Sequence, residues 1–75
     1  MTTGDILRER AIALARSETD LDDAVRDLEE ACEGRRPAVV RARQLLLVSL
    51  DDDPDQPAVA RGVQFLDELL TRLPA

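Results

Sequence analysis

Apolar residues in this chain recur at helical spacing, and no segment alternates apolar and polar residues with a period of two. The clearest pattern covers residues 21–32, where apolar positions follow the i, i+3, i+4, i+7 spacing of one helical face. Acidic residues occupy most of the other positions in this segment. The spacing therefore predicts an all-α fold. The apolar positions of this segment are Leu21, Ala24, Val25, Leu28, Ala31 and Cys32.

Capping residues, glycine and proline mark the ends of the expected helices. Thr2 or Thr3 can cap the first helix, which is expected to run to about Ser17. Gly34 follows the second helix, at the position where a left-handed residue often ends a helix. Pro37 suits the first turn of a third helix, because the N–H that proline lacks has no partner there.

The fourth helix is expected between two further prolines. Pro57 opens it and Pro74 ends it. Residues 1–75 are then predicted to form a single domain of four helices, arranged as two antiparallel hairpins. The connecting loops are expected near residues 18–20, 34–36 and 51–56.

The third expected helix is apolar on nearly all sides from Leu45 to Val48. A helical segment without a polar face is usually buried on two sides. We therefore predict that this helix is the central element of the core. The side chains expected to be most buried are Leu28, Leu46, Leu47, Leu66 and Leu70.

The fourth expected helix carries a narrow apolar seam that spans about 80° of its circumference. Phe65, the only aromatic residue in the chain, and Leu69 lie outside this seam. In so short a chain, an uncovered apolar face would favour association. We therefore expect a homodimer or a protein complex that uses Phe65, Leu69 and the apolar part of the third helix. The seam consists of Val59, Val63, Leu66, Leu70 and Leu73.

The net charge of −6 is unevenly distributed along the chain. Residues 18–34 carry eight acids and one arginine, whereas residues 35–50 carry four arginines and no acid. Such segments can attract neighbouring helices or another molecule. All basic residues are arginines, which together with the Ala, Leu and Val content suggests a high-GC bacterial genome.

The arginines of residues 35–43 allow an alternative function. Arg36 and Arg41 lie at the start of the third helix, and Gly34 could form the turn of a helix-turn-helix. The alternative is a small dimeric DNA-binding regulator. The acids of the preceding helix would repel the phosphate backbone, which disfavours this function. Pairing of the arginines with acids of a neighbouring helix or a partner explains the same residues.

The segment "LDDDPDQP", residues 50–57, resembles the start of a calcium loop because Asp51, Asp53 and Asp55 alternate. Such a loop needs glycine at its sixth position and glutamate at its twelfth. Counted from Asp51, these positions hold Gln56 and Gly62. We predict a connector between two helices and no metal site.

Catalytic constellations are absent from the sequence. The chain has no histidine, and no nucleophile motif surrounds its serines. Cys32 continues an apolar stripe, so we expect a buried structural thiol. No glycine-rich phosphate loop occurs among three glycines. We expect neither an enzyme nor a cofactor, and no small-molecule substrate is evident.

The expected location is the cytoplasm. No run approaches the ~18 apolar residues that span a bilayer, and the first ten residues, "MTTGDILRER", carry charges where a signal peptide would be apolar. We therefore expect no membrane association.

Residues 20–37 and 58–74 repeat a pattern at a spacing of 38 positions. In each, a small residue is followed by a bulky residue four positions later. This pattern resembles the second helix of a tetratricopeptide repeat. The resemblance implies stacked helical hairpins that bind other proteins without catalysis. The residues that carry it are Ala24, Leu28, Ala31, Gly62, Leu66 and Pro74.

These patterns together predict a non-catalytic protein–protein interaction or adaptor module that self-associates through an apolar helix face. The expected partner is a protein or a second copy, and nucleic acid is disfavoured. The expected partner-binding residues are Phe65, Leu69, Arg36 and Arg41.

Overall fold

The computed structural model describes residues 2–74 and contains four helices. No strand occurs within these residues, so the all-α prediction is confirmed. The helix ends lie within a few residues of the predicted ones, and Gly34 has the expected positive φ of 74°. The helices are α1 (Thr3–Arg16), α2 (Leu21–Cys32), α3 (Arg36–Asp52) and α4 (Pro57–Arg72).

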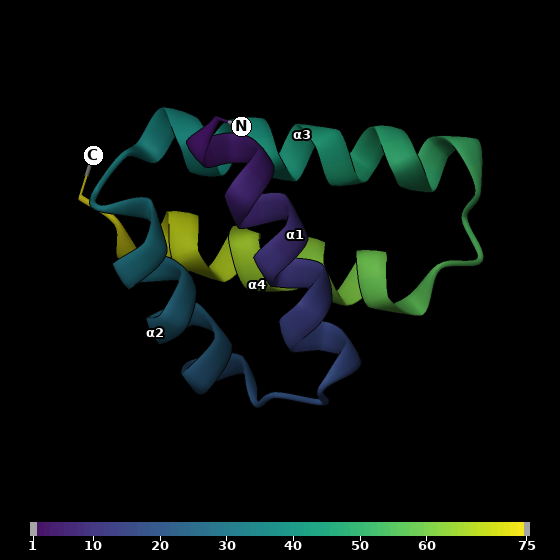
Figure 1. The fold of residues 1–75 in the computed structure, drawn as a ribbon, viewed down its shortest axis with the longest axis horizontal. Coiled ribbons are helices and arrows are strands. Elements are labelled where there is room, and N and C mark those ends of the chain that lie inside the picture. The colour runs from purple at the N-terminus through teal and green to yellow at the C-terminus, as the bar shows by residue number, and fades with distance from the viewer. Residues whose placement is uncertain (1, 75) are drawn as a thin grey trace.

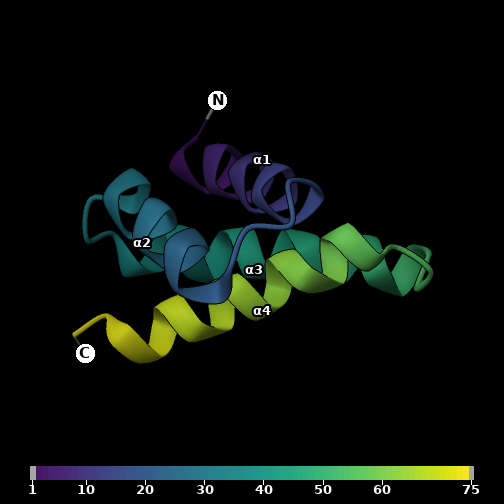
Figure 2. The ribbon, with the colours of Figure 1, turned by 90° about the horizontal axis from the view of Figure 1, so that it is seen from below.

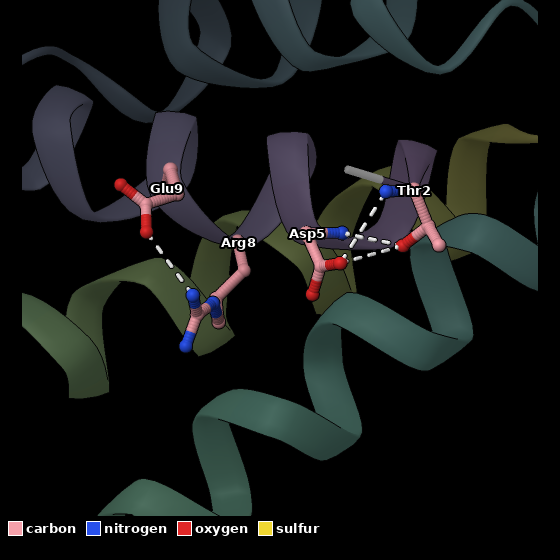
Figure 3. Close-up of polar contacts among 4 residues, drawn as sticks. All are labelled: Thr2, Asp5, Arg8 and Glu9. Carbon is pink, nitrogen blue, oxygen red and sulfur yellow. Dashed lines mark hydrogen bonds and ion pairs between the residues drawn. The ribbon is translucent and has the colours of Figure 1, made fainter.

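A capping box begins α1 at Thr2, one of the two expected capping residues (Figure 3). The backbone N–H of Asp5 donates to the Thr2 hydroxyl over 3.2 Å. In return, the Thr2 hydroxyl donates to the Asp5 carboxylate over 2.9 Å, and the Thr2 backbone N–H donates to it over 3.3 Å. These bonds to the charged form hold the pKa of Asp5 below its ordinary value of 3.8. The first turn of α1 is thus fixed by two residues.

The helices pack with α3 and α4 side by side and α1 across both of them (Figures 1 and 2). The α2 helix packs mainly on α1 and α4 and hardly touches α3. The main neighbours of α1 are α4 and α3 rather than α2, which follows it in sequence. The expected arrangement of two antiparallel hairpins is therefore not confirmed.

Small residues allow α1 to approach α4 closely. A Cβ atom added to Gly62 would lie 3.1 Å from Leu46 Cδ1 and 3.4 Å from Ala11 Cβ. Such distances leave almost no room for a side chain. Gly62 on α4 and Ala11 on α1 therefore set the spacing at the point where α1, α3 and α4 meet.

The central helix of the core is α4, not α3 as the sequence led us to expect. Six residues of α4 are buried, whereas α3 buries three, Val39, Ala42 and Leu46. The α4 helix buries more residues because it contacts all three other helices, whereas α3 has little contact with α2. The buried residues of α4 are Val59, Gly62, Val63, Phe65, Leu66 and Leu69.

The predicted core residues are confirmed in part. Leu28, Leu46 and Leu66 are fully buried, as expected. The prediction is wrong for Leu47, which is exposed, and for Leu70, which is only half-buried. Leu47 follows Leu46 by 100° around the helix and so turns away from the core.

The acidic segment between α3 and α4 is a connector, stabilised by Gln56. The Gln56 side-chain amide donates to the backbone carbonyls of Ser49, over 3.0 Å, and Asp53, over 2.8 Å. The Asp53 carboxylate accepts the backbone N–H of Asp55 over 3.1 Å. These bonds satisfy the end of α3 and fold the chain back toward α4.

Candidate interaction surface

Phe65 and Leu69, the expected partner-binding residues of α4, are fully buried within the chain itself. The Arg61 guanidinium lies over the Phe65 ring, 4.9 Å from its centre. Our expectation that these two side chains lie on an uncovered face is therefore wrong. They contribute to the core and present no surface to a partner in this conformation.

The α2 helix covers the side of α4 that we expected to be open. Arg72 on α4 donates to the Asp22 carboxylate on α2 over 2.6 Å. Phe65 lies within about 20° of Arg72 around the helix, so both residues are on the same side of α4. The hydrogen bond from Arg72 lowers the pKa of Asp22, although both side chains stay accessible to solvent. The buried face of α4 is consequently wider than its apolar seam.

The arginines near the start of α3 differ in their contacts. Arg36 is exposed and donates to the Leu70 carbonyl over 3.1 Å. Arg43 forms an ion pair with Asp67 on α4. Arg35 lies 3.8 Å from Glu33, and it donates to the Thr3 hydroxyl over 3.3 Å. Pairing with an acid of a neighbouring helix, the explanation offered from the sequence, thus applies to Arg43.

Arg41 stands apart from these three arginines. It is exposed and has neither an ion pair nor a hydrogen bond with any residue among 2–74. Its aliphatic stem passes the start of α1, where a Cβ atom on Gly4 would lie 2.8 Å from Arg41 Cγ. The guanidinium is therefore positioned beside α1 with its donors available to another molecule.

The outer face of α3 carries exposed apolar side chains. Val40 and Leu47 each expose 37% of their surface, and Val48 exposes 68%. Gln44 lies at the centre of this face, about 160° from the buried Leu46. Val40 and Val48 lie within about 40° of Gln44, one on each side. We call these four residues, Val40, Gln44, Leu47 and Val48, the α3 outer face.

Charged residues of opposite sign flank the two ends of the α3 outer face. Arg36 and Arg41 lie toward its N-terminal end, and Asp51 and Asp52 lie at its C-terminal end. All four are exposed, and none takes part in an ion pair within the described part of the chain. This order is unfavourable for an isolated helix, whose dipole prefers acids at the N-terminus and bases at the C-terminus.

A second surface feature is an open groove of about 530 Å³ between α1 and α2. Ile6, which is 44% exposed, and Leu14 provide its apolar part. Arg10 and Asp27 form an ion pair at its wall, and this contact raises the pKa of Arg10. The groove thus combines a small apolar floor with charges that already satisfy each other.

The acidic residues and the single cysteine bear on metal binding and thiol chemistry. Among residues 2–74, no cluster of three histidine, cysteine or acidic residues is arranged to hold a metal ion. Cys32 is fully buried, and its thiol donates to the Glu29 carbonyl over 3.2 Å, as expected for a structural thiol. None of the described helices is long and apolar enough to cross a membrane.

The sequence contained a signal for the α3 outer face that we interpreted differently. The apolar run from Leu45 to Val48 indicates two apolar faces, and we assigned the run both to the core and to the association surface. Only one of them is buried. Comparisons with protein-family profiles, with curated proteins and with solved structures find no match for this chain.

Proposed function

We propose that this chain is a non-catalytic protein–protein interaction module that binds its partner through the α3 outer face. The observation that supports this proposal is the exposure of Val40, Leu47 and Val48 on the side of α3 opposite the core. Water disfavours a cluster of exposed apolar side chains, and such a cluster often marks an interaction site. Charged residues at both ends would give the contact specificity.

The proposed site differs from the one first expected. Phe65 and Leu69 have no exposed surface, so the apolar part of α3 is the part of the expected apolar surface that remains available. Arg36 and Arg41 keep their proposed role, because both lie beside the α3 outer face. A DNA-binding regulator, the alternative, would use the same two arginines. It is disfavoured because two further arginines of this region, Arg43 and Arg35, already contact neighbouring side chains.

Two finer features of the fold belong to this proposal. We infer that the chain is organised as two antiparallel helical hairpins and that residues 20–37 and 58–74 correspond to the second helices of tetratricopeptide-like units. The short connections between the helices support the first inference. Distances between pairs of spin labels on α1 and α2 would test it, since antiparallel helices keep a nearly constant separation along their length.

Photocrosslinking in the native host tests the binding role. A photoreactive amino acid in place of Gln44 should give a protein adduct, and the same amino acid in place of the exposed Asp23 on α2 should not. The Gln44 adduct should disappear when Val48→Glu is added, because a carboxylate would be buried in the contact. Equal labelling from both positions, or no adduct from either, would contradict the proposal.

A further inference from the structure

We propose that the occupant of the α3 outer face is a second copy of this chain, docked with its α3 antiparallel to the first. This inference rests on the proposed function, because it names the partner of the same surface. The observation that carries it is the order of charges along α3, with arginines in the first half and aspartates at the end. A helix with that order is complementary to itself when reversed.

A two-fold axis through Gln44 defines the contact. In such a symmetric pair, a residue before the axis residue meets the residue equally far after it on the other copy. Val40 is four residues before Gln44 and Val48 four residues after, so these two valines meet across the axis. Leu47 precedes Val48 by one residue and so also lies near Val40 of the second copy. The exposed apolar residues of the face are thereby covered in one arrangement.

The same register pairs the charges at both ends of the contact. Arg36 lies eight residues before Gln44, and Asp51 and Asp52 lie seven and eight residues after it. Antiparallel docking therefore places the exposed Arg36 of one copy beside the two aspartates of the other, whereas Arg41 lies closer to the axis. Parallel docking would instead place arginine beside arginine and aspartate beside aspartate, which is repulsive.

The helix dipole favours the same orientation. The first turn of α3 has no acid and its last turn has no base, so Asp51 and Asp52 add negative charge to the negative end of the helix. An antiparallel second copy brings its positive helix end and its arginines to this position. The charge order that is unfavourable in a single α3 becomes favourable in the pair.

The contact is expected to be weak because one helix face is narrow. Stable protein interfaces bury ~800 Å² per partner, and a single helix face offers less. We therefore expect a reversible dimer with a Kd on the order of 10–100 µM. Such a dimer forms only where the local concentration of the chain is high, and dilution separates it into folded monomers.

Sedimentation velocity of the purified chain, from about 1 µM to 1 mM, tests for this dimer. Val48→Glu should weaken dimerisation about tenfold or more. Ile6→Glu is the matched control, because Ile6 is also an exposed apolar residue but lies on α1. The control variant should change the Kd by less than about twofold.

Exchange of charges tests the orientation. The variants Arg36→Glu/Arg41→Glu and Asp51→Arg/Asp52→Arg should each dimerise about tenfold more weakly than the original chain, because like charges then meet. An equimolar mixture of the two should dimerise again, since each variant complements the other. In a parallel dimer, by contrast, neither double variant would be weaker than the original chain.

A disulfide provides a readout that does not depend on charge. Gln44→Cys places a thiol on the proposed axis, so oxidation should yield a covalent dimer, and Asp23→Cys on α2 should yield little. If circular dichroism shows that a charge variant has lost its helices, the disulfide experiment replaces the charge exchange as the test of the dimer. Circular dichroism is also recorded for the cysteine variants, so that only folded proteins are compared.

Two results would overturn the inference of self-association. One is a chain that stays monomeric at about 1 mM, and the other is a pair of charge variants that dimerise as well as the original. Failure of the proposed function is distinguishable from either result. A Gln44 photoadduct with a different protein would support the interaction module but show that a second copy is not its partner. The absence of both an adduct and a dimer would contradict both proposals.

Discussion

Helices α3 and α4 show how weakly apolar content alone determines burial. From Leu45 to Val48, α3 is apolar on nearly all sides, whereas α4 carries a narrow seam. In the structure the roles are reversed, because α4 buries twice as many residues as α3, six against three. The difference arises from the neighbours of each helix. Three helices surround α4, and α3 is covered mainly by α1 and α4, which leaves its remaining side in water.

The largest expected effect comes from the aromatic residue of α4. Phe65→Ala should lower the free energy of unfolding by about 3–5 kcal/mol, because a fully buried ring leaves a cavity. Urea unfolding followed by circular dichroism measures this loss. Phe65→Leu provides a milder variant in case the alanine variant does not fold. A loss below about 1 kcal/mol for Phe65→Ala would show that the ring is not held in the core.

A matched pair of leucines compares the two helices directly. Leu69→Ala on α4 should cost about 2–5 kcal/mol, as expected for a fully buried leucine. Leu47→Ala on α3 removes the same atoms from an exposed position and should cost about 1 kcal/mol or less. Both values come from chemical denaturation at low micromolar concentration, where the proposed dimer is dissociated. Equal losses would contradict the difference in burial between α3 and α4.

The close approach of α1 to α4 gives a smaller expected effect. Gly62→Val should destabilise the fold by about 1–3 kcal/mol, because the new side chain overlaps Leu46 and Ala11. Ala60→Val on the same helix is the control for the lower helix propensity of valine, since Ala60 is only half-buried. Thermal unfolding measures both variants. If the two lose the same stability, the spacing of α1 and α4 does not depend on Gly62.

The smallest expected effect concerns the ion pair that closes α2 over α4. Because Arg72 lowers the pKa of Asp22 in the folded state, the unfolded chain binds the proton more readily. The contribution of Asp22 to stability is therefore present above the ordinary pKa of 3.8 and is lost as the pH falls below it. NMR titration of the Asp22 carboxyl group should show a midpoint below 3.8.

Asp22→Asn separates this contribution from those of the other acids. The variant should lose the part of the acid-side pH dependence that belongs to Asp22, whereas Asp23→Asn, at the neighbouring exposed position, should not. An unchanged pH dependence in Asp22→Asn would mean that the ion pair with Arg72 is not maintained in solution.

The sequence predicted the local structure of each helix better than it predicted which helices pack together. Helix ends were predictable because Thr2, Gly34, Pro37 and Pro57 act on the backbone within one turn of themselves. Burial depends on which helices come together in space. The seam of α4 did not reveal that α2 packs against α4, since Arg72 and Asp22, which join the two helices, are separated by 50 residues in the sequence.

The candidate site was predictable only in part for the same reason. Arg36 and Arg41 were identified from the charge pattern, and both are exposed. The apolar run of α3 was also recognised, but the sequence could not assign its two faces separately to core and solvent. Gly62 entered only as a small residue of the repeat pattern and Ala11 gave no signal, because a small residue reveals a close helix contact only when the opposing helix is known.

Phe65 also makes the chain easy to observe by spectroscopy. It is the only aromatic residue, and it lies fully buried beneath Arg61. In an NMR spectrum, every methyl resonance shifted by a ring current must therefore belong to a neighbour of this one ring. Such shifts report directly on the core around the middle of α4. Their disappearance at temperatures at which the rest of the chain still gives dispersed signals would mark a loosening of the core around Phe65 as a separate step that precedes unfolding.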